Sequence, residues 1–185
     1  PGVAITLLLH DWGCAFGYEF AMRHPLRVAR VIALDVGDHN ARALHRQWGL
    51  REKLAVAGYQ IWLALAWKIG GAVGTAMTRV MARALRAPAP AARITYRMNY
   101  PYAMRWFGTA GGFAQAAQVC LPMPLLYVYG KRKPFMFHSQ AWLDKVAQAP
   151  GSAVLALPCG HWLMLDQAET FHAAALQWLA QSDNP

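Results

Sequence analysis

The sequence predicts an α/β fold in which a mostly parallel sheet is flanked by helices and interrupted by a helical insertion. Residues 3–9 and 28–34 are continuous apolar runs, typical of strands that are buried on both faces of a parallel sheet. Residues 14–24 have the pattern of a helix, which Pro25 ends. Strand, turn, helix and strand make a βαβ unit, in which the strands are parallel and the crossover is right-handed.

The last third of the chain returns to the same alternation of strands and helices. Strands are expected over residues 125–129 and 153–157, and helices over residues 137–148 and 167–179. These elements extend the sheet that the first βαβ unit begins.

Between these two regions lies a predicted helical insertion, which we call the lid. Apolar residues recur there at helical spacing, and the sequence Ala87-Pro88-Ala89-Pro90 divides the segment into two helical halves. The expected organisation is an α/β core made of residues 1–39 and 113–185, with residues 40–112 as the lid.

The charge pattern indicates a solvated basic surface and no nucleic-acid partner. The net charge is +9, but the basic residues are scattered, and only Lys131-Arg132-Lys133 forms a run. Residues 55–77 are apolar, but Lys68 and several glycines interrupt them. A lid helix is therefore favoured over a membrane span, and membrane association through the lid is the less favoured alternative.

The three cysteines and the N-terminal residues indicate the cellular compartment and whether a metal site is expected. Cys14, Cys120 and Cys159 lie far apart and lack the spacing of a metal site, so no metal is expected. An odd number of cysteines indicates reduced thiols and an intracellular, cytoplasmic protein. No basic region precedes the first apolar run, so a signal peptide is not expected.

Asp11 is the first candidate catalytic residue, because it follows a predicted strand where the chain turns into a helix. The turn His10-Asp11-Trp12-Gly13 has the arrangement of a nucleophile elbow, which exposes a side chain at the carboxyl edge of the sheet. Backbone N–H groups at the helix start face negative charge that develops there. A carboxylate is ionised at neutral pH, so it attacks a saturated carbon without a base and forms an ester.

His161 is the second candidate, because water must hydrolyse such an ester and the water needs a base. It lies on a tight turn directly after a late predicted strand. Two plainer interpretations stay open, namely Asp11 as a helix N-cap and His161 as a loop histidine. The chain has no Gly-x-Ser-x-Gly motif, which argues against an ordinary serine esterase. Cys14 is expected to be a small buried residue rather than a nucleophile.

Several motifs resemble those of the α/β-hydrolase superfamily, in particular its epoxide hydrolases and haloalkane dehalogenases. They are Leu9-His10-Asp11-Trp12-Gly13, Arg23-His24-Pro25, Tyr129-Gly130 and Gly160-His161-Trp162. The resemblance covers the whole chain and implies an α/β-hydrolase fold with a helical lid. It also implies that an epoxide is hydrolysed through an ester on Asp11, with His161 activating water. A small apolar substrate is implied, and no metal or organic cofactor.

The resemblance implies that two lid tyrosines hold and protonate the epoxide oxygen. The segments that contain Tyr59 and Tyr96 resemble the two that carry these residues in epoxide hydrolases. Tyr100 and Tyr102 lie close to Tyr96 and are alternatives to it. Ordinary packing within the lid is the plainer interpretation of all four side chains.

Haloalkane dehalogenases share the elbow, so dehalogenation at the same site is an alternative function. The resemblance then implies that Trp12 donates its indole N–H to the leaving halide. Many dehalogenases have Gln before the nucleophile, so His10 favours epoxide hydrolysis.

The chain departs from the family pattern at the acid that orients the histidine. The usual position follows Tyr129-Gly130 and falls in Lys131-Arg132-Lys133, which contains no carboxylate. Some dehalogenases take this acid from the end of the strand after the elbow, where Asp35 stands. We expect Asp35 to orient His161, with Asp38 or no acid at all as the alternatives.

Two further departures concern the elbow and the start of the fold. Leu9 stands where the family prefers a small residue, and the sequence begins at the elbow strand. The family's first strands, and the loop that supplies half of its oxyanion hole, precede that strand. We therefore expect an N-terminally truncated α/β-hydrolase with an exposed apolar sheet edge. A catalytically inactive hydrolase fold that serves as a binding module is the remaining alternative.

Overall fold

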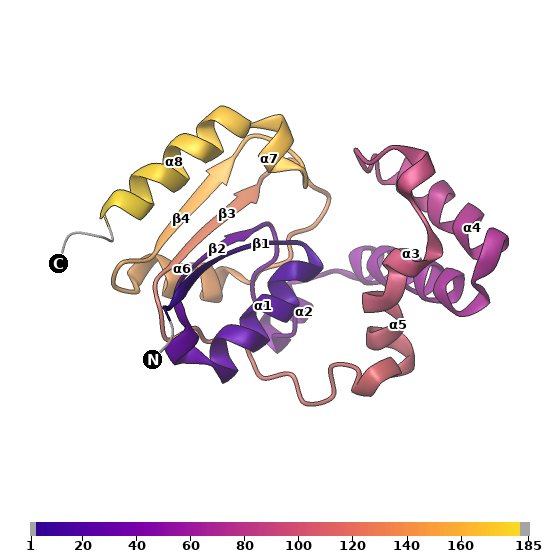
Figure 1. Ribbon diagram of the computed structural model, residues 1–185, viewed down its shortest axis with the longest axis horizontal. Coiled ribbons are helices and arrows are strands. Elements are labelled where there is room, and N and C mark those ends of the chain that lie inside the picture. The colour runs from indigo at the N-terminus through magenta and orange to yellow at the C-terminus, as the bar shows by residue number, and fades with distance from the viewer. Residues whose placement is uncertain (1–2, 182–185) are drawn as a thin grey trace. The chain divides into compact units, whose positions relative to one another are not determined.

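The computed structural model describes residues 3–181, which belong to two compact units (Figure 1). One unit contains residues 1–48 and 117–185, and the other contains residues 49–116. The first unit thus includes α2 (Arg42–Gln47), which the sequence analysis assigned to the lid. The indole N–H of Trp48 donates a hydrogen bond to the carbonyl of Met136 and ties this segment to the first unit.

The described residues of the first unit form a four-stranded sheet in which all strands are parallel. In sheet order, which is also chain order, the strands are β1 (Ile5–His10), β2 (Val28–Leu34), β3 (Leu125–Gly130) and β4 (Ala153–Leu157). The predicted α/β class with a parallel sheet is confirmed. His10 pairs with Leu34 and Gly130 pairs with Leu157, so the residues that follow these strands meet at one edge of the sheet.

Helices cover both faces of this sheet. They are α1 (Trp12–Arg23), α6 (Gln140–Gln148), α7 (Leu163–Asp166) and α8 (Ala168–Gln181). The side chains of β2 alternate between the two faces, as the pleat of a strand requires. Val31 and Ala33 belong to the cluster that α1 and α6 cover, whereas Ile32 and Leu34 belong to the cluster that α7 and α8 cover.

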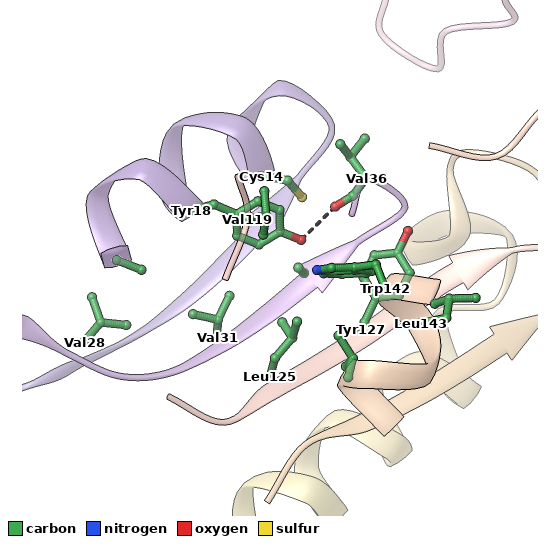
Figure 2. Close-up of a cluster of buried hydrophobic side chains, with 13 residues drawn as sticks. Cys14, Tyr18, Val28, Val31, Val36, Val119, Leu125, Tyr127, Trp142 and Leu143 are labelled. Carbon is green, nitrogen blue, oxygen red and sulfur yellow. Dashed lines mark hydrogen bonds between the residues drawn. The ribbon is translucent and has the colours of Figure 1, made fainter. Parts of the chain in front are cut away.

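Figure 2 shows the cluster between the sheet and the helices α1 and α6. The rings of Tyr127 and Trp142 meet edge to face, with their centroids 4.8 Å apart. The Tyr18 hydroxyl donates a hydrogen bond of 2.7 Å to the carbonyl of Val36, so its buried polar end is satisfied. Burial raises the pKa of Tyr18 well above its ordinary value, so this hydroxyl remains a donor.

The expectation that the first strand is buried on both faces is wrong. Leu7 and Leu9 pack against the cluster beneath α1, but Ile5 is 46% exposed and Leu8 is 63% exposed. The reason is that β1 lies at the edge of the described sheet, and the cluster on the opposite face contains residues of β2, β3 and β4. The continuous apolar run indicates a strand but does not show how many of its faces are covered.

The second unit is helical. Its α-helices within the described residues are α3 (Leu50–Ile69), α4 (Gly71–Ala84) and α5 (Tyr100–Phe107), with short 3-10 turns at Ala91–Arg93, Tyr96–Asn99 and Thr109–Gly111. The predicted break at residues 87–90 coincides with the loop after α4. A further break separates α3 from α4 at Gly70, whose φ of 69° favours glycine. Along residues 3–181, every helix is too short or too polar to cross a membrane.

A small glycine on α1 accommodates the large residue that precedes the elbow. A Cβ atom added to Gly17 would overlap both Cδ atoms of Leu9. Leu9 therefore fills the space above α1 that a side chain at position 17 would otherwise occupy. The two positions are coupled by packing, so they are not independent in their effect on stability.

We predict that Gly17→Ala has opposite effects in two backgrounds. In the natural chain it lowers the free energy of unfolding by about 1–2 kcal/mol, because the new methyl group overpacks against Leu9. In a Leu9→Ala background it raises that free energy by about 0.5–1 kcal/mol, because the space is free and Ala favours the helix more than Gly does. Urea unfolding of the four proteins measures both effects, and additive effects would contradict the coupling.

Candidate active site

Asp11 occupies the sharp turn between β1 and α1. Its φ of 52° and ψ of −127° lie outside the regions that non-glycine residues prefer, so the turn is strained. The N–H of Cys14 donates to the Asp11 carbonyl at 2.9 Å and closes the first turn of the helix. Asp11 stands at the N-cap position, but within the described residues its side chain makes no capping hydrogen bond. Its side chain is 42% exposed, so the carboxylate is accessible to solvent.

His161 lies on the loop between β4 and α7, and its two ring nitrogens face two different carboxylates. Nδ1 is 2.5 Å from Oδ2 of Asp35, and Nε2 is 4.0 Å from Oδ1 of Asp11. The first distance is a short hydrogen bond, whereas the second is too long for a direct one. The imidazole is therefore held at Nδ1 by Asp35, while Nε2 faces the Asp11 carboxylate across 4.0 Å.

Asp35 follows β2 and is completely buried. Its backbone φ of 71° is a second strained position at the same edge of the sheet. Oδ1 accepts hydrogen bonds from the N–H of Gly130 at 3.0 Å and from Nζ of Lys133 at 2.5 Å. Since an ionised carboxylate only accepts hydrogen bonds, Nδ1 of His161 must be the donor to Oδ2. The lone pair of the neutral imidazole is then on Nε2, where a general base requires it.

Gly130 allows the end of β3 to approach the histidine loop closely. A Cβ atom at this position would overlap the carbonyl oxygen of Gly160, which is backbone and cannot rotate away. The N–H of Gly130 therefore reaches Asp35 from one side while the loop with His161 approaches from the other. The absence of a side chain at residue 130 is a packing requirement of the site.

Lys133 is buried together with the carboxylate that it contacts. The exposed fractions of the Lys133 and Asp35 side chains are 7% and 0%. Burial lowers the pKa of Lys133, while the adjacent carboxylate of Asp35 acts in the opposite direction. The run Lys131-Arg132-Lys133, where the family resemblance places a carboxylate, thus supplies the cation that contacts Asp35.

His10 supports the histidine loop from the end of β1. Its Nε2 is 3.2 Å from the carbonyl oxygen of His161, and the two rings lie 4.5 Å apart between centroids. The ring of Trp162 is 5.2 Å from that of His10. Burial and the neighbouring His161 lower the pKa of His10. A neutral His10 donates its Nε2–H to the carbonyl and holds the loop backbone beside the elbow.

The structure brings Asp11, Asp35 and His161 together as the sequence analysis expected of a site. Asp38, the alternative acid, instead accepts hydrogen bonds from the backbone N–H and the hydroxyl of Ser139, which precedes α6. Trp12 is the first residue of α1. The roles of these residues stay predictions.

Tyr59 and Tyr96 lie in the second unit. The Tyr59 ring meets that of Tyr102 edge to face at 6.1 Å, and its hydroxyl accepts a hydrogen bond from Gln60. Tyr96 begins a 3-10 turn and packs close to Gly70, at the junction of α3 and α4. These contacts are the packing that the sequence analysis gave as the plainer interpretation, and the catalytic roles of both tyrosines stay predictions.

Two neighbouring side chains, Lys133 and His138, are not predicted by the sequence as part of the site. Lys133 lies in a run that the sequence analysis noted only because it contains no carboxylate. The signal for Lys133 was available, because an acid moved to Asp35 leaves a buried negative charge that needs a partner. Cys14 is fully buried, and burial raises its pKa to about 12, which agrees with a packing role.

Comparison with known proteins shows similarity at the level of structure. No protein-family model matches the chain, and no curated protein matches its sequence. A mutant of an epoxide hydrolase from Bacillus megaterium superposes with a TM-score of 0.64 at 16% identity, covering 96% of this chain and 69% of that one. A loop variant of a haloalkane dehalogenase from Bradyrhizobium elkanii has a TM-score of 0.53 at 20% identity, covering 97% and 68%.

An esterase from a marine microorganism also matches, with a TM-score of 0.52 at 12% identity, covering 95% of this chain and 70% of that one. The chain therefore has the α/β-hydrolase fold and spans about two thirds of the length of these structures. At such low identities the likeness establishes the fold alone. Within residues 3–181, no three His, Cys, Asp or Glu side chains gather in a way that would hold a metal ion.

His138 is a buried neutral group behind the Asp35–Lys133 pair. Its Nδ1 is 2.8 Å from the Tyr127 hydroxyl. Burial, reinforced by the positive charge of Lys133, lowers the pKa of His138 from 6.5 to about 4. In the unfolded chain it binds a proton near its ordinary pKa. The stability that depends on its neutral form is therefore fully present above about pH 6.5 and is lost as the pH falls towards 4.

We predict that His138→Gln reduces the dependence of stability on pH. Between about pH 7.5 and pH 5, neutral burial of His138 should account for a loss of about 2 kcal/mol in the free energy of unfolding. Urea unfolding at the two pH values measures this loss in the natural chain and in the variant. His172→Gln, a change of the same kind at an exposed position of α8, is the matched control and should keep the full loss. An unchanged loss in His138→Gln would contradict the assignment.

Proposed function

We propose that the protein is a hydrolase that opens epoxides through a covalent ester on Asp11. The observation that supports this most strongly is the position of His161, held by Asp35 at Nδ1 and facing the Asp11 carboxylate with Nε2. A carboxylate nucleophile needs no activation, but its ester needs a base for hydrolysis, and this arrangement supplies both.

In the first step an oxygen of Asp11 attacks a carbon of the epoxide. The bond between that carbon and the ring oxygen breaks, and the ring oxygen takes a proton as an alkyl ester forms. Tyr59 and Tyr96 are the proposed proton donors. The strained backbone of Asp11 supports its role, because such strain concentrates at functional sites and here exposes the carboxylate.

In the second step water attacks the carbonyl carbon of the ester. Nε2 of His161 accepts a proton from the water, and the negative charge on the carbonyl oxygen develops beside the N–H groups at the start of α1. Asp35 stabilises the imidazolium that forms. When the intermediate collapses, the bond between the ester carbon and the alcohol oxygen breaks, and the leaving alkoxide takes the second proton of the water. A diol leaves and the Asp11 carboxylate is regenerated, while the proton on His161 returns to the group that protonated the ring oxygen in the first step. The separation of 4.0 Å between Nε2 and Oδ1 of Asp11 is suited to a bridging water.

Dehalogenation is the second candidate, and Trp12 supports it. Its place at the first position of α1, directly after Asp11, is where an indole N–H can bind a leaving halide. The ester and its hydrolysis would be the same, but the first step would release a halide ion and the product would carry one hydroxyl group. Halide release from a chloroalkane or bromoalkane, without diol formation from epoxides, would select this candidate.

We predict the path of the oxygen atom in a single turnover. With enzyme in excess over a small apolar epoxide in 18O-labelled water, label should enter the Asp11 carboxylate and not the diol, because water attacks the ester carbonyl. Mass spectrometry of the peptide that contains Asp11 and of the diol measures both.

Matched variants complete this experiment. Asp11→Asn should abolish turnover, whereas Asp144→Asn, which changes an exposed carboxylate on α6, should retain it. Label in the diol with an unlabelled Asp11 would exclude the ester. Absence of turnover with both epoxides and haloalkanes would favour the catalytically inactive binding module.

A further inference from the structure

The buried lysine beside Asp35 has a consequence for the base. Asp35 has two oxygens, and two donors hold one of them, Gly130 and Lys133, while His161 takes the other. Lys133 carries its positive charge at 7% exposure, so solvent screens it poorly. The negative charge of Asp35 is thus shared between the ammonium group of Lys133 and a histidine that gains its charge only when it binds a proton.

Charged and titratable groups lie after every strand at this edge, near His161 or near the Asp35–Lys133 pair. Within the described residues they include His10 and Asp11 at β1, Arg132 and His138 after β3, Cys159 after β4 and Asp166 in α7. Among them, Lys133 alone is an ammonium group bonded directly to the carboxylate that holds the imidazole.

We propose that Lys133 is a positioning residue that weakens the basicity of His161 by occupying one oxygen of Asp35. An Asp35 carboxylate without this cation would stabilise the imidazolium more strongly, and His161 would hold its proton to a higher pH. With Lys133 present, Asp35 still orients the His161 ring but stabilises the protonated imidazolium less. His161 then stays neutral, and able to act as a base, down to a lower pH.

This inference rests on the proposed function, in which a protonated His161 cannot activate water. A weaker base keeps a larger fraction of His161 neutral and ready in mildly acidic solution, at the cost of some driving force for proton transfer. Lys133 therefore sets the pH range over which the ester is hydrolysed, although it contacts neither substrate nor water in this scheme.

The protonation of His161 is measured by NMR on the complete chain with 15N-labelled histidine, without any substrate. In Lys133→Met the titration midpoint of the His161 ring should move upward by about one pH unit, the scale expected for a charge at this range in a poorly screened site. Lys133→Arg keeps the cation and should restore the midpoint. Lys131→Met removes an exposed charge from the same loop and is the matched control, with its midpoint unchanged.

A second measurement on the natural chain covers the case in which Lys133→Met fails to fold. As Lys133 loses its proton in alkaline solution, Asp35 should accept the His161 Nδ1 proton more strongly. That proton resonance should move downfield in step with the titration of Lys133 Nζ. Resonances that move together support the inference. An independent Nδ1 proton overturns it, as does an unmoved midpoint in folded Lys133→Met or an equal shift in Lys131→Met.

The same variants separate this inference from the proposed function. If both hold, the acid limb of the kcat profile for epoxide hydrolysis moves upward in Lys133→Met by the amount seen in the NMR titration, and Lys133→Arg restores it. If the proposed function fails, the natural chain itself shows no hydrolysis, whatever the NMR titration gives. If only the inference fails, the natural chain hydrolyses the epoxide and the limb stays in place in the folded variant.

Discussion

The carboxylate of Asp35 holds a negative charge where solvent is excluded, and the site is organised around that charge. The N–H of Gly130 and the ammonium group of Lys133 compensate one oxygen, and His161 compensates the other. A buried charge of this kind is tolerated only with close, well-directed partners. Moving any one of these partners away would leave part of the charge uncompensated, which costs free energy, so each partner keeps its position. The orientation of His161 towards Asp11 follows from this requirement.

The parallel sheet makes the convergence possible. Asp11 follows β1, Asp35 follows β2, Lys133 follows β3 and His161 follows β4, so residues that are far apart in the chain share one edge. Two of them, Asp11 and Asp35, have strained backbones. Strain at these two positions is sustained by the strands and helices on either side, and it turns both carboxylates towards one histidine.

The sequence predicted the elements of the fold that depend on local pattern. The strands at residues 28–34 and 153–157 and the elbow at Asp11 follow from apolar runs and turn residues. The apolar run at residues 3–9 did not by itself predict the exposure of Leu8, because burial depends on neighbours that a single strand does not reveal. The family resemblance pointed to Asp35 at the end of the strand after the elbow, but its ion pair with Lys133 joins residues 98 positions apart, and no local pattern encodes such a contact.

The most direct test of the account is to remove the base and look for the ester. His161→Gln, treated with a small apolar epoxide, should gain the mass of one epoxide molecule, because Asp11 still attacks but water is no longer activated. Intact-protein mass spectrometry with peptide mapping should place the added mass on Asp11 and show none in the double variant Asp11→Asn/His161→Gln. A folded His161→Gln protein that gains no mass, or gains it at another residue, would contradict the account.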